Sequence, residues 1–290
     1  MKRIALIGVE NSHAPAFANL IKNNPEKYGD IEIVGVYSYD GAAARKMVDD
    51  GLAPMAVDTS SYFLEAEGGV DGVINTARHG DNHYEYSMPY IKAGVPMFID
   101  KPFCIMPHNA AEMITEAEKA GTLLCGGSCL KFAPEMAALK AELASGNIGK
   151  VLSASLSAPI NMTNPYGNFY FYAGHLAQML VTMFGLPASV YAIAREKAVT
   201  VLCRYADFEV TLHYANYTYS VTVHAEKATR YTTCENITAL YEAELDEFCN
   251  MLRNGTMEEP YDLLAAPVAL LHAIYLSYST GTEQAVRPIR

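Results

Sequence analysis

The sequence places a lysine directly after a segment that is predicted to be a buried strand. The stretch AGVPMFIDKPF runs from apolar residues into Asp100, Lys101 and Pro102. Proline disfavours the helical conformation for the residue before it, so Lys101 should remain extended at the strand end. In doubly wound sheets the carboxyl ends of the strands face the ligand. A lysine desolvated in such a cleft could act as an acid–base group, whereas the tripeptide taken alone favours an ordinary surface lysine at a strand end.

A second candidate site lies in the stretch KRIALIGVENSHAPAF, which predicts a strand, a turn and a helix. A phosphate loop of the type G-x-G-x-x-G would carry glycine at positions 8, 10 and 13. Only Gly8 is present, and Glu10 and His13 occupy the other two positions. We predict that Asn11, Ser12, His13 and the helix N-terminus hold a phosphate group, whereas the Glu10 carboxylate opposes it. The alternative is a strand–turn–helix unit without a ligand.

The second predicted strand ends in VGVYSYD, which bears on the choice of cofactor. Dinucleotide-binding sheets often carry an acidic residue here, and it binds the adenosine ribose. Ser38 takes this position, so a 2′-phosphate would not be repelled, yet Asp40 is close enough in sequence to reach a ribose. The residues are thus compatible with either NAD or NADP, and Ser38 is predicted to contact the cofactor.

The elements that position these residues follow from the apolar pattern of the first 125 residues. Short apolar segments alternate there with helical patterns, which predicts a parallel sheet with helices on both faces. The strands are expected at residues 4–9, 31–37, 72–76, 96–99 and 122–125, and the helices at 14–23, 42–49, 84–93 and 110–120.

The pattern changes after a further helix expected at residues 134–144. Apolar and polar residues alternate at 201–205, 210–214 and 219–223, with turns at Ala206–Asp207 and Ala215–Asn216. This alternation predicts antiparallel strands with one covered face, followed by helices near 245–252 and 264–279. The predicted fold is an α/β Rossmann domain with a doubly wound parallel sheet (1–126), followed by an α+β domain with a mainly antiparallel open sheet (127–290). Its uncovered sheet face predicts a homo-oligomer, either a dimer or a tetramer.

Composition argues against several classes of function. The 290 residues carry a net charge of −11 without a Lys/Arg block longer than two residues, which argues against nucleic-acid binding. No run of eighteen apolar residues is present, so no membrane span is predicted. Without an export signal, a cytoplasmic protein with six reduced cysteines is expected. The close pairs Cys125/Cys129 and His79/His83 lack further donors, so no metal is predicted.

Four stretches resemble successive blocks of the Gfo/Idh/MocA family, which is named for glucose–fructose oxidoreductase and inositol dehydrogenase. Family members join a Rossmann domain to an open, mainly antiparallel sheet, and most oxidise or reduce sugars or polyols with NAD(P). The resemblance implies that Lys101 contacts the reacting hydroxyl and that Asp100, Thr76 and His83 lie on the cofactor side. The four stretches are GVINTARHGDNHYEYSMPYIKAGVPMFIDKPF, LLCGGSCLKFAPEMAALKAELASGNIGKVLSASLS, YEAELDEFCNMLRNG and LLHAIYLSYSTGTEQAVRPI.

A second family motif, D-x-G-x-H-x-x-D, resembles the run FYAGHLAQ. His175 is kept, and Phe171 and Gln178 replace the two acids. The resemblance implies that His175 binds the substrate or exchanges the hydroxyl proton. Tyr172 is expected to contact the substrate, because the face of a tyrosine ring can stack on a sugar ring; the alternative is that the tyrosines fill the sheet core. Lys131 is a further expected substrate contact.

Three interpretations of the function follow. The first is an NAD(P)-dependent oxidoreductase that acts on a small sugar- or polyol-like alcohol by hydride transfer. The second is a degenerate, non-catalytic member that binds a sugar or a partner as a sensor or structural subunit. The third is a member that uses NAD to cleave glycosides. The replaced motif residues favour the second interpretation, and only the first predicts a net change in the cofactor.

Overall fold

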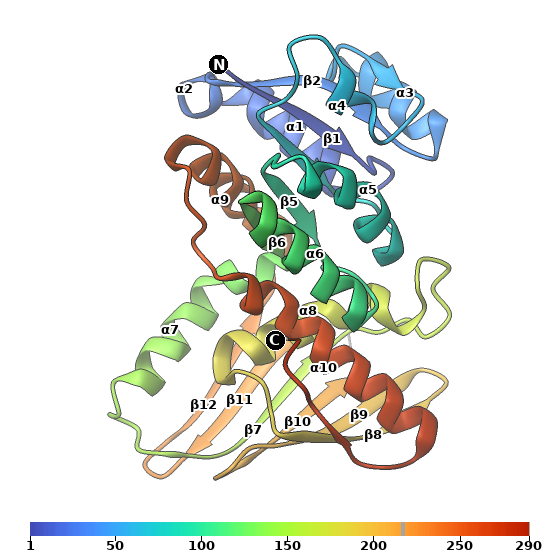
Figure 1. Ribbon diagram of the computed structural model, residues 1–290. Helices are drawn as coiled ribbons and strands as arrows, with labels where there is room; N and C mark the ends of the chain where they lie inside the picture. The colour runs from blue at the N-terminus through green and yellow to red at the C-terminus, as the bar shows by residue number, and fades with distance from the viewer. Residues whose placement is uncertain (216–217, 290) are drawn as a thin grey trace. The chain divides into compact units, whose positions relative to one another are not determined.

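The computed structural model describes residues 1–215 and 218–289 and divides into two compact units (Figure 1). The first unit comprises Met1–Gly127 and Tyr241–Leu264, and the second comprises Ser128–Leu240 and Ala265–Arg290. The sequence placed every residue after 126 in the second domain, whereas Tyr241–Leu264 groups with the first unit. The reason is α9 (Tyr241–Asn254), which packs against α1 (His13–Asn23) and β6 (Leu124–Gly127).

The sheet of the first unit has six parallel strands in the order β3-β2-β1-β4-β5-β6. This confirms the predicted doubly wound sheet, in which the order reverses next to β1. Ile4 and Leu6 of β1 are fully buried, as expected of a central strand covered on both faces. Strand β3 was not predicted, because two residues carry no periodic pattern. The strands are β1 (Lys2–Ile7), β2 (Ile31–Tyr37), β3 (Ala56–Val57), β4 (Gly72–Asn75), β5 (Met97–Asp100) and β6.

Two helix ends in the first unit have a clear local cause. Asp40 caps the N-terminus of α3, because its Oδ1 accepts the N–H groups of Ala42 and Ala43 at 3.0 and 3.4 Å. Gly121 ends α6 in the left-handed conformation, with φ at +68°. Besides α1 and α9, these helices are α2 (Pro25–Tyr28), α3 (Gly41–Asp49), α4 (Tyr62–Glu65), α5 (Gly80–Lys92) and α6 (Pro107–Ala120).

The sheet of the second unit has the order β12-β11-β7-β10-β9-β8-β13 and is mainly antiparallel, as predicted. Strand β7 lies between β10 and β11, parallel to the first and antiparallel to the second. The expected direct neighbours at 210–214 and 219–223 are therefore separated, and the turn predicted at Ala215–Asn216 lies partly outside the described residues. The strands are β7 (Val151–Ala158), β8 (Ser189–Arg195), β9 (Ala198–Arg204), β10 (Glu209–Tyr214), β11 (Tyr219–Ala225), β12 (Thr229–Cys234) and β13 (Gln284–Ala285).

Helices cover one face of this sheet (Figure 1). Helix α8 packs on β7 and β10, and Ser277 of α10 accepts the Ala192 N–H of β8 at 2.8 Å. By length and composition α10 could span a membrane, but 61% of its most apolar window is buried inside the protein, as in the core helix of a globular domain. The helical segments are η1 (Cys129–Phe132), α7 (Pro134–Ala144), α8 (Phe169–Phe184), η2 (Ile237–Leu240) and α10 (Tyr261–Thr280).

Several large apolar side chains on the strands of this sheet are exposed, and we propose that they pair with a second copy of the chain. Leu152, Tyr191, Ile193 and Tyr231 are between 38% and 67% exposed. Ile193→Glu places a charge among them, so we expect it to shift sedimentation velocity at micromolar concentration from an oligomer to a monomer. Tyr62→Glu, at an exposed apolar position of the first unit, is the control. A wild-type monomer in this measurement would contradict the proposal.

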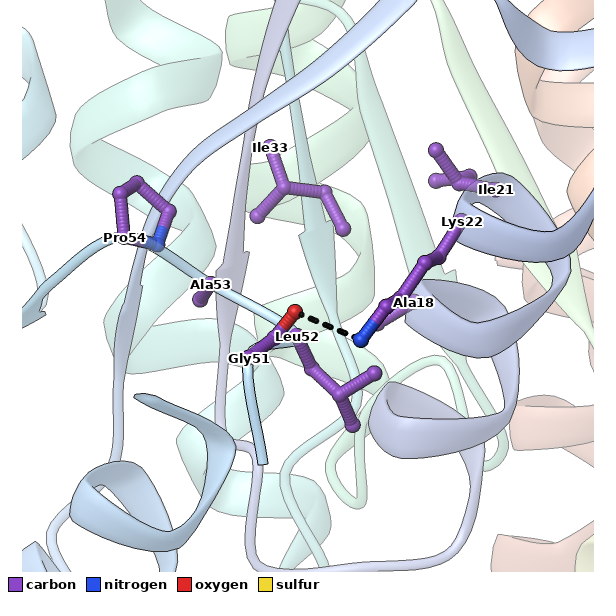
Figure 2. A pocket seen from close by; sticks show the side chains of 8 residues that line it. All are labelled: Ala18, Ile21, Lys22, Ile33, Gly51, Leu52, Ala53 and Pro54. Atoms are coloured by element: carbon purple, nitrogen blue, oxygen red, sulfur yellow. Dashed lines mark hydrogen bonds between the residues drawn. The ribbon is translucent and has the colours of Figure 1, made fainter. Parts of the chain in front are cut away.

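A pocket in the first unit is lined by residues of α1, β2 and the segment after α3 (Figure 2). It has a volume of about 430 Å³, and Lys22 Nζ donates to the Gly51 carbonyl at 3.2 Å along its wall. The lining is otherwise apolar, and no predicted site residue contributes to it. The lining residues come from α1, β2 and the segment after α3: Ala18, Ile21, Lys22, Ile33, Gly51, Leu52, Ala53 and Pro54.

Candidate active site

The end of β5 carries the predicted acid–base lysine. Asp100, the last strand residue, is buried, and its Oδ1 accepts the Lys101 N–H at 2.6 Å. Burial alone would raise the pKa of Asp100, but its electrostatic interactions with His13, Lys101 and His83 outweigh burial and hold that pKa below its usual range. Asp100 is thus a buried carboxylate that fixes the backbone of Lys101. Lys101 itself is partly exposed at the carboxyl edge, where the sequence placed it.

His13 does not face solvent as a phosphate donor, which corrects the expectation from the sequence. It is 5% exposed, with Nδ1 at 3.6 Å from Asp100 Oδ2 and Nε2 at 3.5 Å from Glu244 Oε2. The Tyr241 ring lies 4.1 Å from its ring centroid. Burial lowers the pKa of His13, although Asp100 opposes this shift. Helix α9, which supplies Glu244 and Tyr241, thus encloses the imidazole.

His13, Asp100 and Glu244 are the one group of three potential metal ligands within 1–215 and 218–289. The two carboxylates approach opposite nitrogens of one imidazole ring. One potential ligand atom from each residue nevertheless lies within 4.8 Å of the others. We interpret the three side chains as a buried histidine between two carboxylates.

The N-terminus of α1 is already capped by the protein itself. Asn11 Oδ1 accepts the N–H groups of His13 and Ala14 at 2.8 and 3.4 Å, and its amide donates to the Thr76 carbonyl. Pro15 has no N–H group to offer. The Asn11 side chain therefore occupies the two amides that were predicted to hold a phosphate. Ser12 is exposed, with Oγ at 3.5 Å from the hydroxyl of Tyr241.

Three predicted cofactor residues make contacts between the loops that follow β1, β4 and β5. These residues are Gly8, Thr76 and His83. A Cβ on Gly8, at φ +72°, would lie 2.4 Å from the Ala77 backbone, so only glycine permits this close approach. Thr76 is fully buried, and its Oγ1 donates to the Gly8 carbonyl at 3.1 Å. His83 is fully buried, with its ring nitrogens at 2.6 and 2.7 Å from the carbonyls of Pro102 and Ala77. It positions the loops after β4 and β5 through these two contacts, and its predicted place on the cofactor side stays a prediction.

Glu10 reaches the end of β2, a contact that the sequence did not predict. Its Oε2 accepts the Ser38 hydroxyl at 2.7 Å, and its Oε1 accepts the Arg78 N–H at 3.0 Å. Ser38 is 6% exposed and also accepts the Asp40 N–H at 3.1 Å. The carboxylate thus joins the carboxyl ends of β2 and β4 across the end of β1.

In the second unit, α8 holds His175 in a polar contact with the start of η1. His175 is 6% exposed, and its Nδ1 lies 2.7 Å from Ser128 Oγ. The Tyr219 ring packs edge-on against the imidazole at 5.6 Å between centroids. Ser128 and Tyr219 therefore fix the ring of the predicted substrate residue. The sequence identified neither of them, because both are distant from residue 175 along the chain.

A cavity of about 670 Å³ in the second unit includes Tyr172, one of the predicted substrate contacts. Tyr219, which packs on His175, lines the same cavity. Polar side chains from Asn161, Thr163 and Glu196 add hydrogen-bonding groups to the wall. Lys131 is not a lining residue of this cavity, and its Nζ lies 4.9 Å from the ring centroid of Phe132.

The first unit fits the riboses and the nicotinamide of a dinucleotide better than its diphosphate. Asp100 and Lys101 stand at the carboxyl edge, and a carboxylate lies at the end of β2. The α1 amides, by contrast, are bound by Asn11. A diphosphate must therefore displace the Asn11 oxygen or bind without these two donors.

Residues 2–127 match the model of the GFO_IDH_MocA family, described as an oxidoreductase family with an NAD-binding Rossmann fold. This match covers the Rossmann domain, which is less than half of the chain, and shows that this domain is similar to the NAD-binding domain of that family. Inositol 2-dehydrogenase of Acidothermus cellulolyticus is 30% identical over 160 residues, 53% of this chain and 44% of the relative. D-glucoside 3-dehydrogenase of Escherichia coli is 26% identical over 123 residues, 42% of this chain and 34% of the relative. The matches thus span less than half the length of these relatives.

Solved structures of similar fold cover the second unit as well. Myo-inositol 2-dehydrogenase from Lactobacillus plantarum superposes with a TM-score of 0.85 at 14% identity, over 99% of both chains. GenD2 from gentamicin A biosynthesis, solved with NAD, gives 0.84 at 16% identity over 99% of this chain and 96% of its own. At these identities the likeness establishes the two-domain fold.

Proposed function

We propose that this chain is an NAD(P)-dependent oxidoreductase that acts on an alcohol group of a small sugar- or polyol-like compound. The observation that carries the proposal is the Asp100–Lys101 pair at the carboxyl edge of β5, in a domain that is similar to the NAD-binding domain of an oxidoreductase family. Dehydrogenases with inositol and glucoside substrates among the relatives support the substrate class.

Each candidate residue has a chemical role in this proposal. A bound nicotinamide supplies or accepts the hydride. When the alcohol is oxidised, the neutral Lys101 amine accepts the hydroxyl proton, and in the reverse reaction the resulting ammonium returns it to the carbonyl oxygen. The buried Asp100 carboxylate fixes the lysine backbone. In the second unit, His175 binds a substrate hydroxyl, while Ser128 and Tyr219 hold its ring in one orientation. Tyr172 presents its ring in the adjoining cavity to the apolar face of a sugar or polyol.

The first test is a titration of the purified chain with NADH and NADPH, followed by nicotinamide fluorescence. Saturable binding of at least one of them is expected. A screen of polyols and glycosides for NAD(P)H formation then identifies the substrate, beginning with myo-inositol and D-glucosides because relatives bear these names. The proposal would be contradicted if the chain bound neither NADH nor NADPH and formed no NAD(P)H with any compound of the screen.

A non-catalytic binding protein is the second candidate, and the capped α1 terminus favours it. Asn11 occupies the amides that a diphosphate would use, and Phe171 and Gln178 replace the acids of the second motif. Such a protein would bind a sugar or polyol in the 670 Å³ cavity without turnover. Calorimetry with the same compounds in the absence of cofactor distinguishes the two functions.

Replacing His175 by glutamine should raise KM about five- to tenfold, because a net hydrogen bond contributes roughly 1 kcal/mol. The expected change is smaller in kcat, since the proposal assigns proton exchange to Lys101. His224→Gln is the matched control, as His224 is exposed on β11 and contacts Thr229 Oγ1 at 3.1 Å. Equal kinetics of the two variants would remove His175 from the site.

A further inference from the structure

The acidic residue that the end of β2 lacks is supplied by the loop after β1. Ser38 follows β2, and the Glu10 carboxylate lies 2.7 Å from its hydroxyl. The second oxygen of Glu10 is held by the Arg78 N–H at 3.0 Å. Two donors from opposite sides of β1 therefore fix this carboxylate at the position where dinucleotide-binding sheets place their ribose acceptor.

The other acid near this position is already engaged. Asp40 Oδ1 caps α3 through the N–H groups of Ala42 and Ala43. Withdrawing it would expose two amides and cost about as much as losing a helix cap. Glu10 accepts only one hydrogen bond at each oxygen among the bonds described above, and a carboxylate oxygen has room for a second. Glu10 is thus the better placed acceptor.

We propose that Glu10 binds the adenosine ribose hydroxyls of NAD(H) and discriminates against NADP(H). The inference rests on the proposed function, because it requires that the chain binds a dinucleotide. A 2′-phosphate would meet the Glu10 carboxylate at the end of β2, and such like-charge contacts are strongly unfavourable. Two arginines are candidates to offset this repulsion: Arg78, whose N–H holds Glu10, and Arg45 on α3, which is exposed to solvent, where its charge is screened.

Glu10→Gln tests the charge without removing the anchors. The glutamine oxygen can accept the Arg78 N–H, and its amide can donate to Ser38 Oγ, so the shape of the loop is retained. Glu26→Gln, an exposed glutamate on α2, is the matched control for net charge. If Glu10→Gln does not fold, as judged by its thermal transition, Glu10→Ala takes its place.

The measurement is the dissociation constant of NADH and of NADPH for each variant, from nicotinamide fluorescence. We expect the wild-type chain and Glu26→Gln to prefer NADH by about tenfold or more, and Glu10→Gln to reduce this preference to within about threefold. An unchanged preference in Glu10→Gln overturns the inference alone. If Glu10→Gln lowers the dissociation constants of NADH and NADPH by the same factor, the inference is overturned too, because the Glu10 side chain would then compete with the ribose for its site.

Two further outcomes separate this inference from the proposed function. A wild-type preference for NADPH that is lost in Arg45→Ala overturns the role of Glu10 and leaves the oxidoreductase proposal intact. Binding of neither NADH nor NADPH by the wild-type chain overturns the proposed function, and the inference fails with it.

Discussion

Lys101→Met should reduce turnover by about 10²–10⁴-fold, the range that general acid–base groups contribute. Methionine keeps much of the side-chain volume but cannot hold or release a proton. The backbone contact from the Lys101 N–H to Asp100 does not involve the replaced atoms, so the fold should persist. We expect the loss in kcat, with the affinity for the cofactor changed little. The measurement is steady-state kinetics on the substrate found by the screen.

The control for this prediction is Lys92→Met, an exposed lysine at the end of α5 in the same unit. It removes the same charge and should leave turnover unchanged. If Lys101→Met retains turnover close to that of the wild-type chain, then Lys101 is not the acid–base group. A loss of the thermal transition in Lys101→Met would instead assign the lysine a structural role.

Gly8→Ala should destabilise the first unit by about 2–5 kcal/mol. Its φ of +72° lies in the left-handed region, where a side chain costs roughly 1–2 kcal/mol. In addition, the new Cβ would lie 2.4 Å from the backbone of Ala77, and forced overpacking typically costs about 1–3 kcal/mol. Domains are stable by only about 5–15 kcal/mol, so urea unfolding should detect the change easily.

Gly121→Ala separates the two contributions to this loss. Gly121 also has a positive φ, +68°, but a Cβ there would have no neighbour within 4 Å. It should therefore cost only the conformational part, about 1–2 kcal/mol. Equal destabilisation by the two variants would show that the loop of Gly8 and the loop of Ala77 are not in close contact.

In the loop between Gly8 and α1, the N–H groups at the helix start are already hydrogen-bonded within the protein. The amides of His13 and Ala14 are bound by Asn11, while Glu10 is tied to Ser38 and Arg78. The proposed cofactor chemistry therefore requires either a rearrangement of Asn11 or binding that depends more on the riboses than on the diphosphate.

The sequence by itself determined the class of fold and the place of Lys101, the proposed acid–base residue, at the end of a strand. Alternating strand and helix patterns are local, and each apolar period reports which faces of a segment are buried. This sufficed for the six-stranded parallel sheet except β3, and for α7 over Pro134–Ala144. The position of Lys101 after β5 was equally local, because Pro102 and the preceding apolar run define the strand end.

Tertiary structure alone decided where the polar side chains of the site point. His13 is buried because Tyr241 and Glu244 enclose it, and no local pattern links residues separated by more than 200 positions. Glu10 contacts Ser38 because β1 pairs with β2. Strand β7 lies between β10 and β11 because its backbone pairs with both of them. A periodic pattern specifies that a face is buried but not which segment covers it, since many apolar surfaces can satisfy the same hydrophobic requirement. The partners of His13, Glu10 and β7 are therefore properties of the folded chain and not of its local sequence.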